Sequence, residues 1–342
     1  MHTPGHTFES ITYLLRDQNE NDYAIFTGDT LFLGDVGRPD LSQDTVVNAK
    51  HLAGLLYDSL RNKIMPLDDK VIIYPGHGEG SSCGKSLSSE TVGTLGDQKK
   101  TNYALRENMT KSEFIDEVLE GLDLPPKYFP LNVSMNKNGY DDSKEVLDKN
   151  LNPLDPDEFE DLIKKRNAII LDVRHQDDFA KAHIPNSIFI GLDGRFAPWV
   201  GEILEDIKTP ILLVVPNGRE EEVITRLSRV GFDHTLGFLK GGIENWKSKE
   251  KTISSIDSSE SSVLNDLENK SKHLILDVRS SDEHQNESIS GSLNIPLKSI
   301  NKSIDQINFK SKFYIHCQGG YRSMIAASIL KKNGIHSFSD VK

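Results

Sequence analysis

The sequence predicts an α/β protein built around parallel sheets, and two observations carry this prediction. First, one pattern occurs twice, at 168–190 and 274–296, and each copy has an apolar strand that ends in Asp-Val-Arg. Second, strands alternate with amphipathic helices, which is typical of helices packed around a mainly parallel sheet. Because an internal repeat determines the architecture, we expect two tandem domains of one design, preceded by a different region.

Composition indicates a globular protein without membrane or nucleic-acid partners. The 342 residues carry a net charge of -12, whereas nucleic-acid binding normally shows as a basic face. No stretch approaches the roughly 18 consecutive apolar residues of a membrane span. Because no signal-peptide pattern occurs, we expect a cytoplasmic protein. The two cysteines, Cys83 and Cys317, stand far apart in sequence, so each is judged as a possible reactive thiol rather than as half of a disulfide.

Residues 1–100 are predicted to form a region of their own, and 101–151 an extension of it. The expected elements of the first region are strands at 11–17, 22–35 and 70–80 and a helix at 43–64. The extension is expected to form a helix at 111–122, followed by an irregular, proline-containing connector.

Residues 152–250 and 252–342 are the two copies of the repeat. In each copy an amphipathic helix precedes the Asp-Val-Arg strand, and a second apolar strand with a helix after it comes later. These helices are expected at 156–166 and 261–270, and the later strands at 210–215 and 312–316. The join between the copies is polar and serine-rich, which is the composition of a linker.

In the second copy, a strand delivers Cys317 into a turn that leads to a helix. The turn consists of Gln318, Gly319, Gly320 and Tyr321. Backbone N–H groups in such a turn favour an anion, so we expect a nucleophilic thiolate and a cradle for an extra sulfur atom. The two glycines allow the backbone to fold tightly around the sulfur, and Arg322 adds a cation beside it. A buried structural cysteine is the alternative.

The Cys-x-Gly-Gly-x-Arg-Ser loop, with an Asp-Val-Arg strand before it, resembles a rhodanese (sulfurtransferase) domain. The resemblance implies that Cys317 accepts a sulfane sulfur as a persulfide and passes it to a thiol, cyanide or sulfite. Phosphatases of the Cdc25 type share this fold with a loop one residue longer, so the short loop favours sulfur as the ligand. The first copy has Pro216 at the cysteine position, which implies a catalytically silent domain that serves as a spacer or docking surface.

Three turns of the first region contain glycine and a metal-binding side chain at the end of a strand. These side chains are His6 in HTPGHTFES, Asp29 in FTGDTLF and His77 in YPGHGEG. Turns at separate strand ends can converge on one metal ion, for which imidazole and carboxylate are suitable ligands. A lone His or Asp at a turn is usually solvated or a cap, but three in an ordered set favour a metal site.

This set resembles the second half of the metallo-β-lactamase fold, and the Gly-Arg-x-Asp segment after Asp29 resembles the persulfide dioxygenase branch. The resemblance implies Fe(II) held by His6 and Asp29, with His77 close by and Arg38 in contact with the persulfide. The family's His-x-His-x-Asp-His motif does not occur in the sequence. We therefore expect an N-terminally truncated domain, the C-terminal half of an αββα sandwich. Cys83 is either a persulfide relay or an ordinary loop thiol.

These resemblances together imply an enzyme of sulfane-sulfur metabolism and sulfide detoxification. A persulfide dioxygenase activity, expected to be impaired by truncation, would turn a low-molecular-weight thiol persulfide and O2 into sulfite. Cys317 would then transfer sulfane sulfur to the sulfite, giving thiosulfate. Two alternatives stay open: a zinc-dependent thioester hydrolase of the glyoxalase II type, and a non-enzymatic sulfur-carrier or binding module. Homo-oligomerisation also stays open, and we expect the second repeat to be clipped at its C-terminus.

Overall fold

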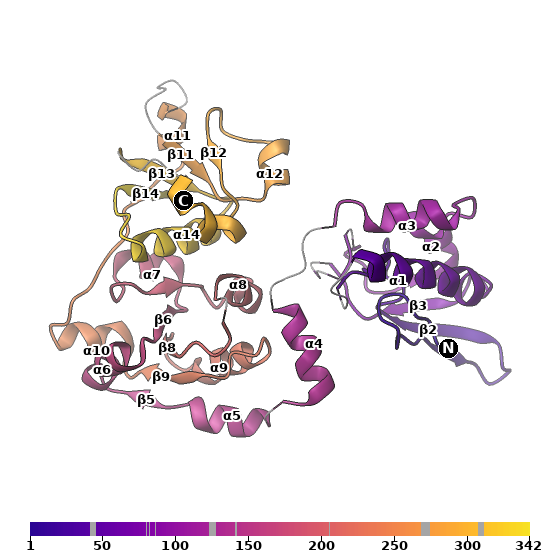
Figure 1. The fold of residues 1–342 in the computed structure, drawn as a ribbon, viewed down its shortest axis with the longest axis horizontal. Helices are drawn as coiled ribbons and strands as arrows, with labels where there is room; N and C mark the ends of the chain where they lie inside the picture. The colour runs from indigo at the N-terminus through magenta and orange to yellow at the C-terminus, as the bar shows by residue number, and fades with distance from the viewer. Residues whose placement is uncertain are drawn as a thin grey trace. The chain divides into compact units, whose positions relative to one another are not determined.

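The chain forms two compact units, Met1–Lys137 and Asn138–Lys342 (Figure 1). The computed structural model describes residues 1–41, 46–79, 81, 83–85, 87–122, 128–140, 142–204, 206–267, 274–306 and 311–342. Among these residues, no helix has both the length and the apolar character that crossing a membrane requires.

The first unit contains a mixed sheet of order β1-β2-β3-β4, in which only β2 and β3 are parallel. Its strands are β1 (Tyr13–Arg16), β2 (Asp22–Gly28), β3 (Ile72–Pro75) and β4 (Gly93–Thr94). Its helices are α1 (Val46–Ser59), continued by a π-helical turn (Leu60–Ile64), then α2 (Leu95–Thr101), a 3-10 turn (Tyr103–Leu105) and α3 (Lys111–Leu119). Ile25 and Ile73 of the strands share one core with Leu56 and Phe114 of the helices.

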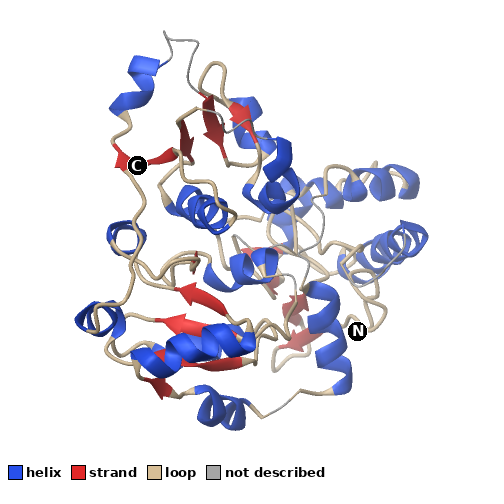
Figure 2. Cartoon of the chain, turned by 60° about the vertical axis from the view of Figure 1, so that its left-hand side comes forward, coloured by secondary structure: helices blue, strands red, loops and turns tan. Residues whose placement is uncertain are grey.

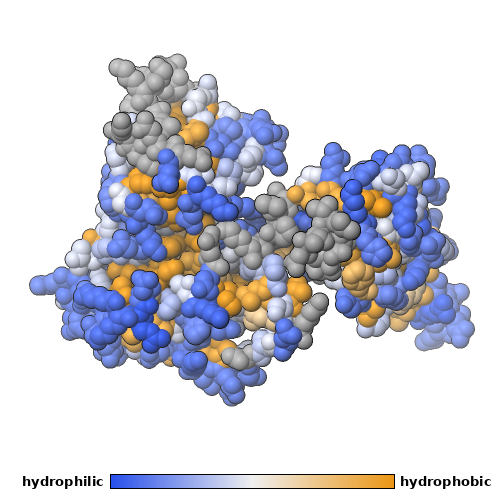
Figure 3. All heavy atoms as spheres, viewed as in Figure 1, coloured by the Kyte–Doolittle hydropathy of each residue, from blue (hydrophilic) through white to orange (hydrophobic). Residues whose placement is uncertain are grey.

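Both faces of this sheet carry apolar side chains. Tyr13, Leu15, Phe26 and Tyr74 alternate with the core residues and are exposed, and the rings of Phe26 and Tyr74 stack with centroids 5.1 Å apart. A strand with apolar residues on both faces is typical of a sheet inside a layered sandwich. On the molecular face drawn in Figure 3, apolar residues form patches in a mainly hydrophilic surface.

The second unit contains two five-stranded sheets of the same design, with every strand pair parallel. The first sheet has the order β5-β9-β8-β6-β7 and the second β10-β14-β13-β11-β12. Their strands are β5 (Pro153–Leu154), β6 (Ile169–Asp172), β7 (Ile188–Phe189), β8 (Ile211–Val214), β9 (Thr235–Leu239), β10 (Ser258–Ser259), β11 (Leu274–Asp277), β12 (Leu293–Asn294), β13 (Phe313–His316) and β14 (Phe338–Val341). The predicted tandem α/β repeat is therefore confirmed.

Helices pack around the strands of both sheets (Figure 2). The first repeat has α6 (Pro156–Arg166), α7 (Gln176–Lys181), α8 (Phe196–Ile203), α9 (Glu220–Ser228) and α10 (Gly242–Ser248). The second has α11 (Ser262–Leu267), α12 (Ser281–Asn286), 3-10 turns (Leu297–Ser299 and Ile304–Gln306), α13 (Ile300–Ser303) and α14 (Tyr321–Lys332). Helix α14 also touches the first repeat, because the Phe189 N–H donates to Ser328 Oγ at 3.0 Å.

The segment between α3 and the first repeat differs from the prediction. An irregular connector was expected there, but the described residues form α4 (Phe129–Asn138) and α5 (Ser143–Asn150). The Asp142 side chain caps α5 by accepting hydrogen bonds from two backbone N–H groups. Val146 is buried, and the Asn150 amide donates to the Asp233 carbonyl in the first repeat at 3.0 Å. Tertiary packing and the cap therefore make α5 helical despite its polar composition.

Candidate functional site

Strand β13 and helix α14 place Cys317 as the sequence predicts. The strand ends at His316, Cys317 follows it with its side chain half-buried, and α14 begins at Tyr321. Gly320 is the N-cap of α14 and has φ +77, a left-handed conformation that glycine adopts without strain. The sulfur atom therefore lies in a turn at a helix N-terminus, where free backbone N–H groups favour an anion.

Arg322 is held by a carboxylate rather than presented freely to the sulfur. Its guanidinium donates two hydrogen bonds to Glu283 of α12, with N–O distances of 2.6 and 2.7 Å. This bond and a smaller contribution from Ser280 lower the pKa of Glu283 to about 2, although partial burial opposes the shift. A planar two-point pair of this kind fixes orientation as well as charge. Sequence reasoning missed Glu283, although its capping box with Ser280 was a readable signal.

A second carboxyl group that the sequence did not reveal lies behind the cysteine. The Cys317 thiol donates to Ser323 Oγ at 3.5 Å, and Ser323 is fully buried. Asp340 of β14 is 1% exposed, and its Oδ1 atom has no hydrogen-bond partner among the described residues. Burial raises the pKa of Asp340 to about 7, while a hydrogen bond with Ser323 acts in the opposite direction. Asp340 is a single acidic residue in a four-residue strand, and it forms no sequence pattern that would have predicted its place beside Ser323.

The Asp-Val-Arg motif forms the same ion pair in both repeats. In the first repeat, Arg174 Nη2 lies 2.6 Å from Asp172 Oδ2 and also donates to a backbone carbonyl at 2.8 Å. In the second, Arg279 Nη2 lies 2.6 Å from Asp277 Oδ2 and donates to a carbonyl at 2.7 Å. Both aspartates are fully buried. The motif therefore stabilises the strand end in each repeat.

In the first unit the three predicted metal-binding residues come together. His6 Nε2 and His77 Nε2 lie 3.3 and 3.4 Å from Asp29 Oδ2. His6 Nδ1 is 2.8 Å from the Arg38 carbonyl oxygen, which orients the ring as the outer hydrogen bond of a metal-binding histidine does. Two imidazole nitrogens and a carboxylate oxygen suit Fe(II) or Zn(II), so the residues present fit such an ion.

Cys83 lies at the same place, and Arg38 is tied to a neighbour. The sulfur of Cys83 and the ligand atoms of Asp29 and His77 all lie within 4.8 Å of one another. Burial raises the pKa of the Cys83 thiol, and the charge of Asp29 adds to the rise. Arg38 donates to both carboxylate oxygens of Asp40, at 3.0 and 2.8 Å, and its side chain is 6% exposed. The contact of Arg38 with a persulfide therefore stays a prediction.

Comparison with known proteins identifies the two repeats. The family profile of the rhodanese-like domain matches residues 155–249 and 260–342, which together make up more than half of the chain. The chain belongs to the rhodanese-like family. Asp172 pairs with Val214 and Asp277 with His316, so by strand register Val215 corresponds to Cys317. Counted back from the helix that follows, which begins at Glu220 in the first repeat and at Tyr321 in the second, Pro216 corresponds to Cys317. Neither residue carries a thiol.

The chain is also similar to proteins with the metallo-β-lactamase fold. A metallo-β-lactamase structure from Staphylococcus aureus is 31% identical with a TM-score of 0.60, covering 70% of this chain and 66% of that one. The mitochondrial persulfide dioxygenase of Mus musculus is 32% identical over 135 residues, 39% of this chain and 44% of the relative. A hydroxyacylglutathione hydrolase of Haemophilus influenzae is 36% identical over 89 residues, 26% of this chain and 37% of the relative.

These findings confirm the predicted fusion of a metallo-β-lactamase-like region with rhodanese-like domains. The chain spans only 34% to 44% of the length of the curated relatives that it matches.

Proposed function

We propose that this chain is a sulfurtransferase of sulfane-sulfur metabolism in which Cys317 carries the sulfur. The observation that carries the proposal is the half-buried Cys317 in a tight turn before the N-terminus of α14. The rhodanese-like family match to the same residues supports it. A structural cysteine would not need a left-handed glycine and a clamped arginine beside it.

The proposed chemistry has two balanced steps. In the first, the Cys317 thiolate attacks the outer sulfur of a low-molecular-weight persulfide; a new S–S bond forms, the old one breaks, and the thiol leaves as thiolate. In the second, the lone pair of sulfite attacks the outer sulfur on Cys317, the S–S bond breaks, and thiosulfate leaves while the Cys317 thiolate returns. The turn's N–H groups stabilise negative charge on the sulfur in both states. Arg322, fixed by Glu283, adds a positive charge nearby.

The metal-binding residues support a second proposed activity in the first unit. His6 and Asp29, with His77 close by, would hold an iron ion, which would supply oxidation of a persulfide by O2 to sulfite. That activity would provide the acceptor for the Cys317 step. The zinc thioester hydrolase stays a second candidate, because the same residues suit Zn(II) and a hydroxyacylglutathione hydrolase is among the relatives.

The test is persulfide loading of the full chain followed by intact-mass measurement. Wild-type protein treated with a thiol persulfide should gain one sulfur atom on Cys317 and lose it to sulfite. Cys317→Ser should gain none there, and Cys83→Ser, the matched control, should load as wild type does. Retained transfer in Cys317→Ser would refute the assignment. Metal analysis of the same wild-type preparation decides between iron and zinc, and a metal-free chain that does not transfer sulfur would favour a binding module.

A further inference from the structure

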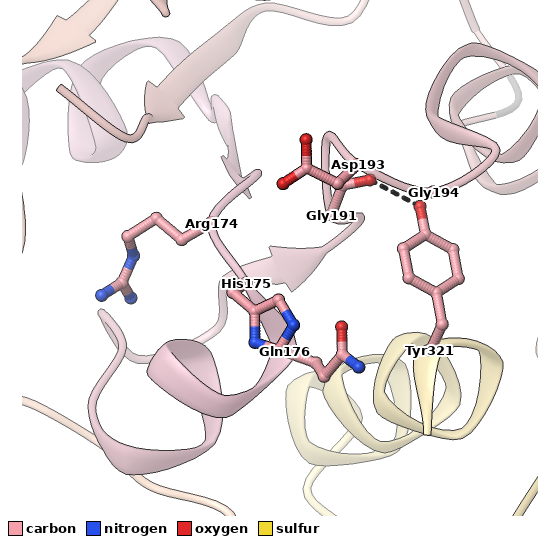
Figure 4. A pocket seen from close by; sticks show the side chains of 7 residues that line it. All are labelled: Arg174, His175, Gln176, Gly191, Asp193, Gly194 and Tyr321. Carbon is pink, nitrogen blue, oxygen red and sulfur yellow. Dashed lines mark hydrogen bonds between the residues drawn. The ribbon is translucent and has the colours of Figure 1, made fainter. Parts of the chain in front are cut away.

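The loop that carries Cys317 is anchored in the repeat that has no cysteine. Tyr321, the first residue of α14, donates its hydroxyl to the carbonyl of Gly191 at 2.6 Å, and Figure 4 shows the ring pointing from α14 into the Gly191–Gly194 turn of the first repeat. A Cβ atom on Gly194 would lie 2.3 Å from a ring carbon of Tyr321, and one on Gly191 3.1 Å away. The turn therefore accepts the ring because glycine stands at 194.

Further contacts join the two repeats around this ring. Phe189 of β7 packs edge-on against Tyr321, with centroids 5.9 Å apart. The amide nitrogen of Gln176 lies 4.0 Å from the place that a Cβ on Gly320 would take, so the first repeat also borders the loop's last glycine. A cavity of about 290 Å³ opens beside the contact and is lined by Tyr321 and by residues of the first repeat (Figure 4).

Tyr321 lies directly after the turn that carries Cys317, so its position bears on the geometry of that turn. It directly follows Gly320, whose φ of +77 sets the direction of the chain into α14. A displacement of the ring would move the backbone of Tyr321, and through it the turn between Cys317 and α14. Misplacement of a reacting group by about 1 Å can cost about a hundredfold in rate. The Gly191–Gly194 turn therefore contacts the residue through which the geometry around Cys317 would be altered.

We propose that the first rhodanese-like repeat is a positioning element of the sulfur-transfer site, with the Gly191–Gly194 turn as a socket for Tyr321. This proposal rests on the proposed role of Cys317 as the sulfur carrier. Tyr321 is a positioning residue: it acts through the backbone of the loop and not on the sulfur itself. The repeat without a cysteine is then neither a spacer nor a docking surface, but a part of the site.

The test is a double-mutant cycle in the full chain with Gly194→Ala and Tyr321→Ala. The readouts are the kcat and KM of transfer from Cys317 to sulfite, the rate of Cys317 alkylation against pH, and the thermal midpoint. Gly194→Ala should lower kcat by about tenfold or more, because the new methyl group displaces the ring, with KM little changed. The double variant should be no slower than Tyr321→Ala alone, because without the ring the methyl group displaces nothing. Tyr140→Ala, at a residue that is 70% exposed, is the control and should behave as wild type.

Three outcomes overturn the proposal. The first is a wild-type kcat and alkylation profile in Gly194→Ala. The second is a double variant whose loss equals the product of the two single losses. The third applies if Gly194→Ala does not fold: Tyr321→Phe, which removes only the hydroxyl, then transfers sulfur at the wild-type rate. A wild-type chain that takes up no sulfur refutes the Cys317 assignment as well, whereas a loaded wild type with an unaffected Gly194→Ala refutes the positioning role alone.

Discussion

Replacing Asp340 by asparagine should stabilise the second rhodanese-like domain at neutral and alkaline pH. The folded protein holds the pKa of this buried carboxyl at about 7, against an ordinary value of 3.8. The folded state binds the proton more tightly than the unfolded state does. The Asp340 carboxyl therefore does not lower the free energy of unfolding below pH 3.8, and it lowers that free energy increasingly as the pH rises toward 7. The difference corresponds to at most about 4 kcal/mol in the free energy of unfolding, since one pKa unit is about 1.4 kcal/mol. Two charged groups also act on this pKa: Lys342, which follows the strand, lowers it, and Asp177 of α7 raises it.

The chain offers a local probe and an internal control for this measurement. Met324 of α14 is fully buried in the second repeat, and Met109 is buried in the first unit. Oxidation of each methionine by peroxide across a urea series, read by peptide mass spectrometry, reports the unfolding of its own region. At about pH 8, Asp340→Asn should raise the urea midpoint at Met324, and at about pH 4 the two proteins should converge. The midpoint at Met109 should not move, nor should any midpoint in Asp257→Asn, whose side chain is 76% exposed. An equal effect at both pH values would refute the reasoning.

Three further predictions concern the two sites. Glu283→Gln should slow transfer from Cys317 and lower the stability of the second domain, because it breaks the two-point bond to Arg322. Since the pKa of Glu283 is about 2 in the folded state and 4.5 ordinarily, the stability difference should be complete above pH 4.5 and vanish as the pH falls through about 2, which urea unfolding would show. Asp29→Ala should remove metal from the purified chain, measured by elemental mass spectrometry, without changing transfer from Cys317; undiminished metal would exclude Asp29 as a ligand. Val215→Cys should not gain sulfur in the intact-mass assay, because its loop lacks the Gly-Gly pair, and loading there would show that position alone suffices.

Local patterns were predicted well because their causes are local. The turn after Cys317 follows from two glycines between an apolar strand and a helix. The turns that bring His6 and Asp29 together likewise contain glycines that are visible in the local sequence. Partners that come from distant segments were missed. Glu283 meets Arg322, and the first repeat meets Tyr321, only after the sheets are assembled, so no spacing in the sequence indicated these contacts.

Helix α5 of the connector was missed for a related reason, since its stability comes from a cap and from packing on the first repeat. Strand register points to Val215 and the helix start to Pro216 as the counterpart of Cys317, because the loop of the first repeat is one residue longer. Tertiary contacts thus decide what the local sequence leaves open.

The paired Asp-Val-Arg strands have a consequence for how such chains are recognised and re-engineered. The segment that makes the duplication visible holds a strand end in place, since Arg174 and Arg279 each donate to their own aspartate and to a backbone carbonyl. The residues that hold the fold and the residues proposed to carry the chemistry therefore lie in separate stretches of the sequence. A copy without a thiol can therefore keep the same fold, and a search that relies on the shared strand will find copies with and without the cysteine alike. Only the few residues after the later strand distinguish them.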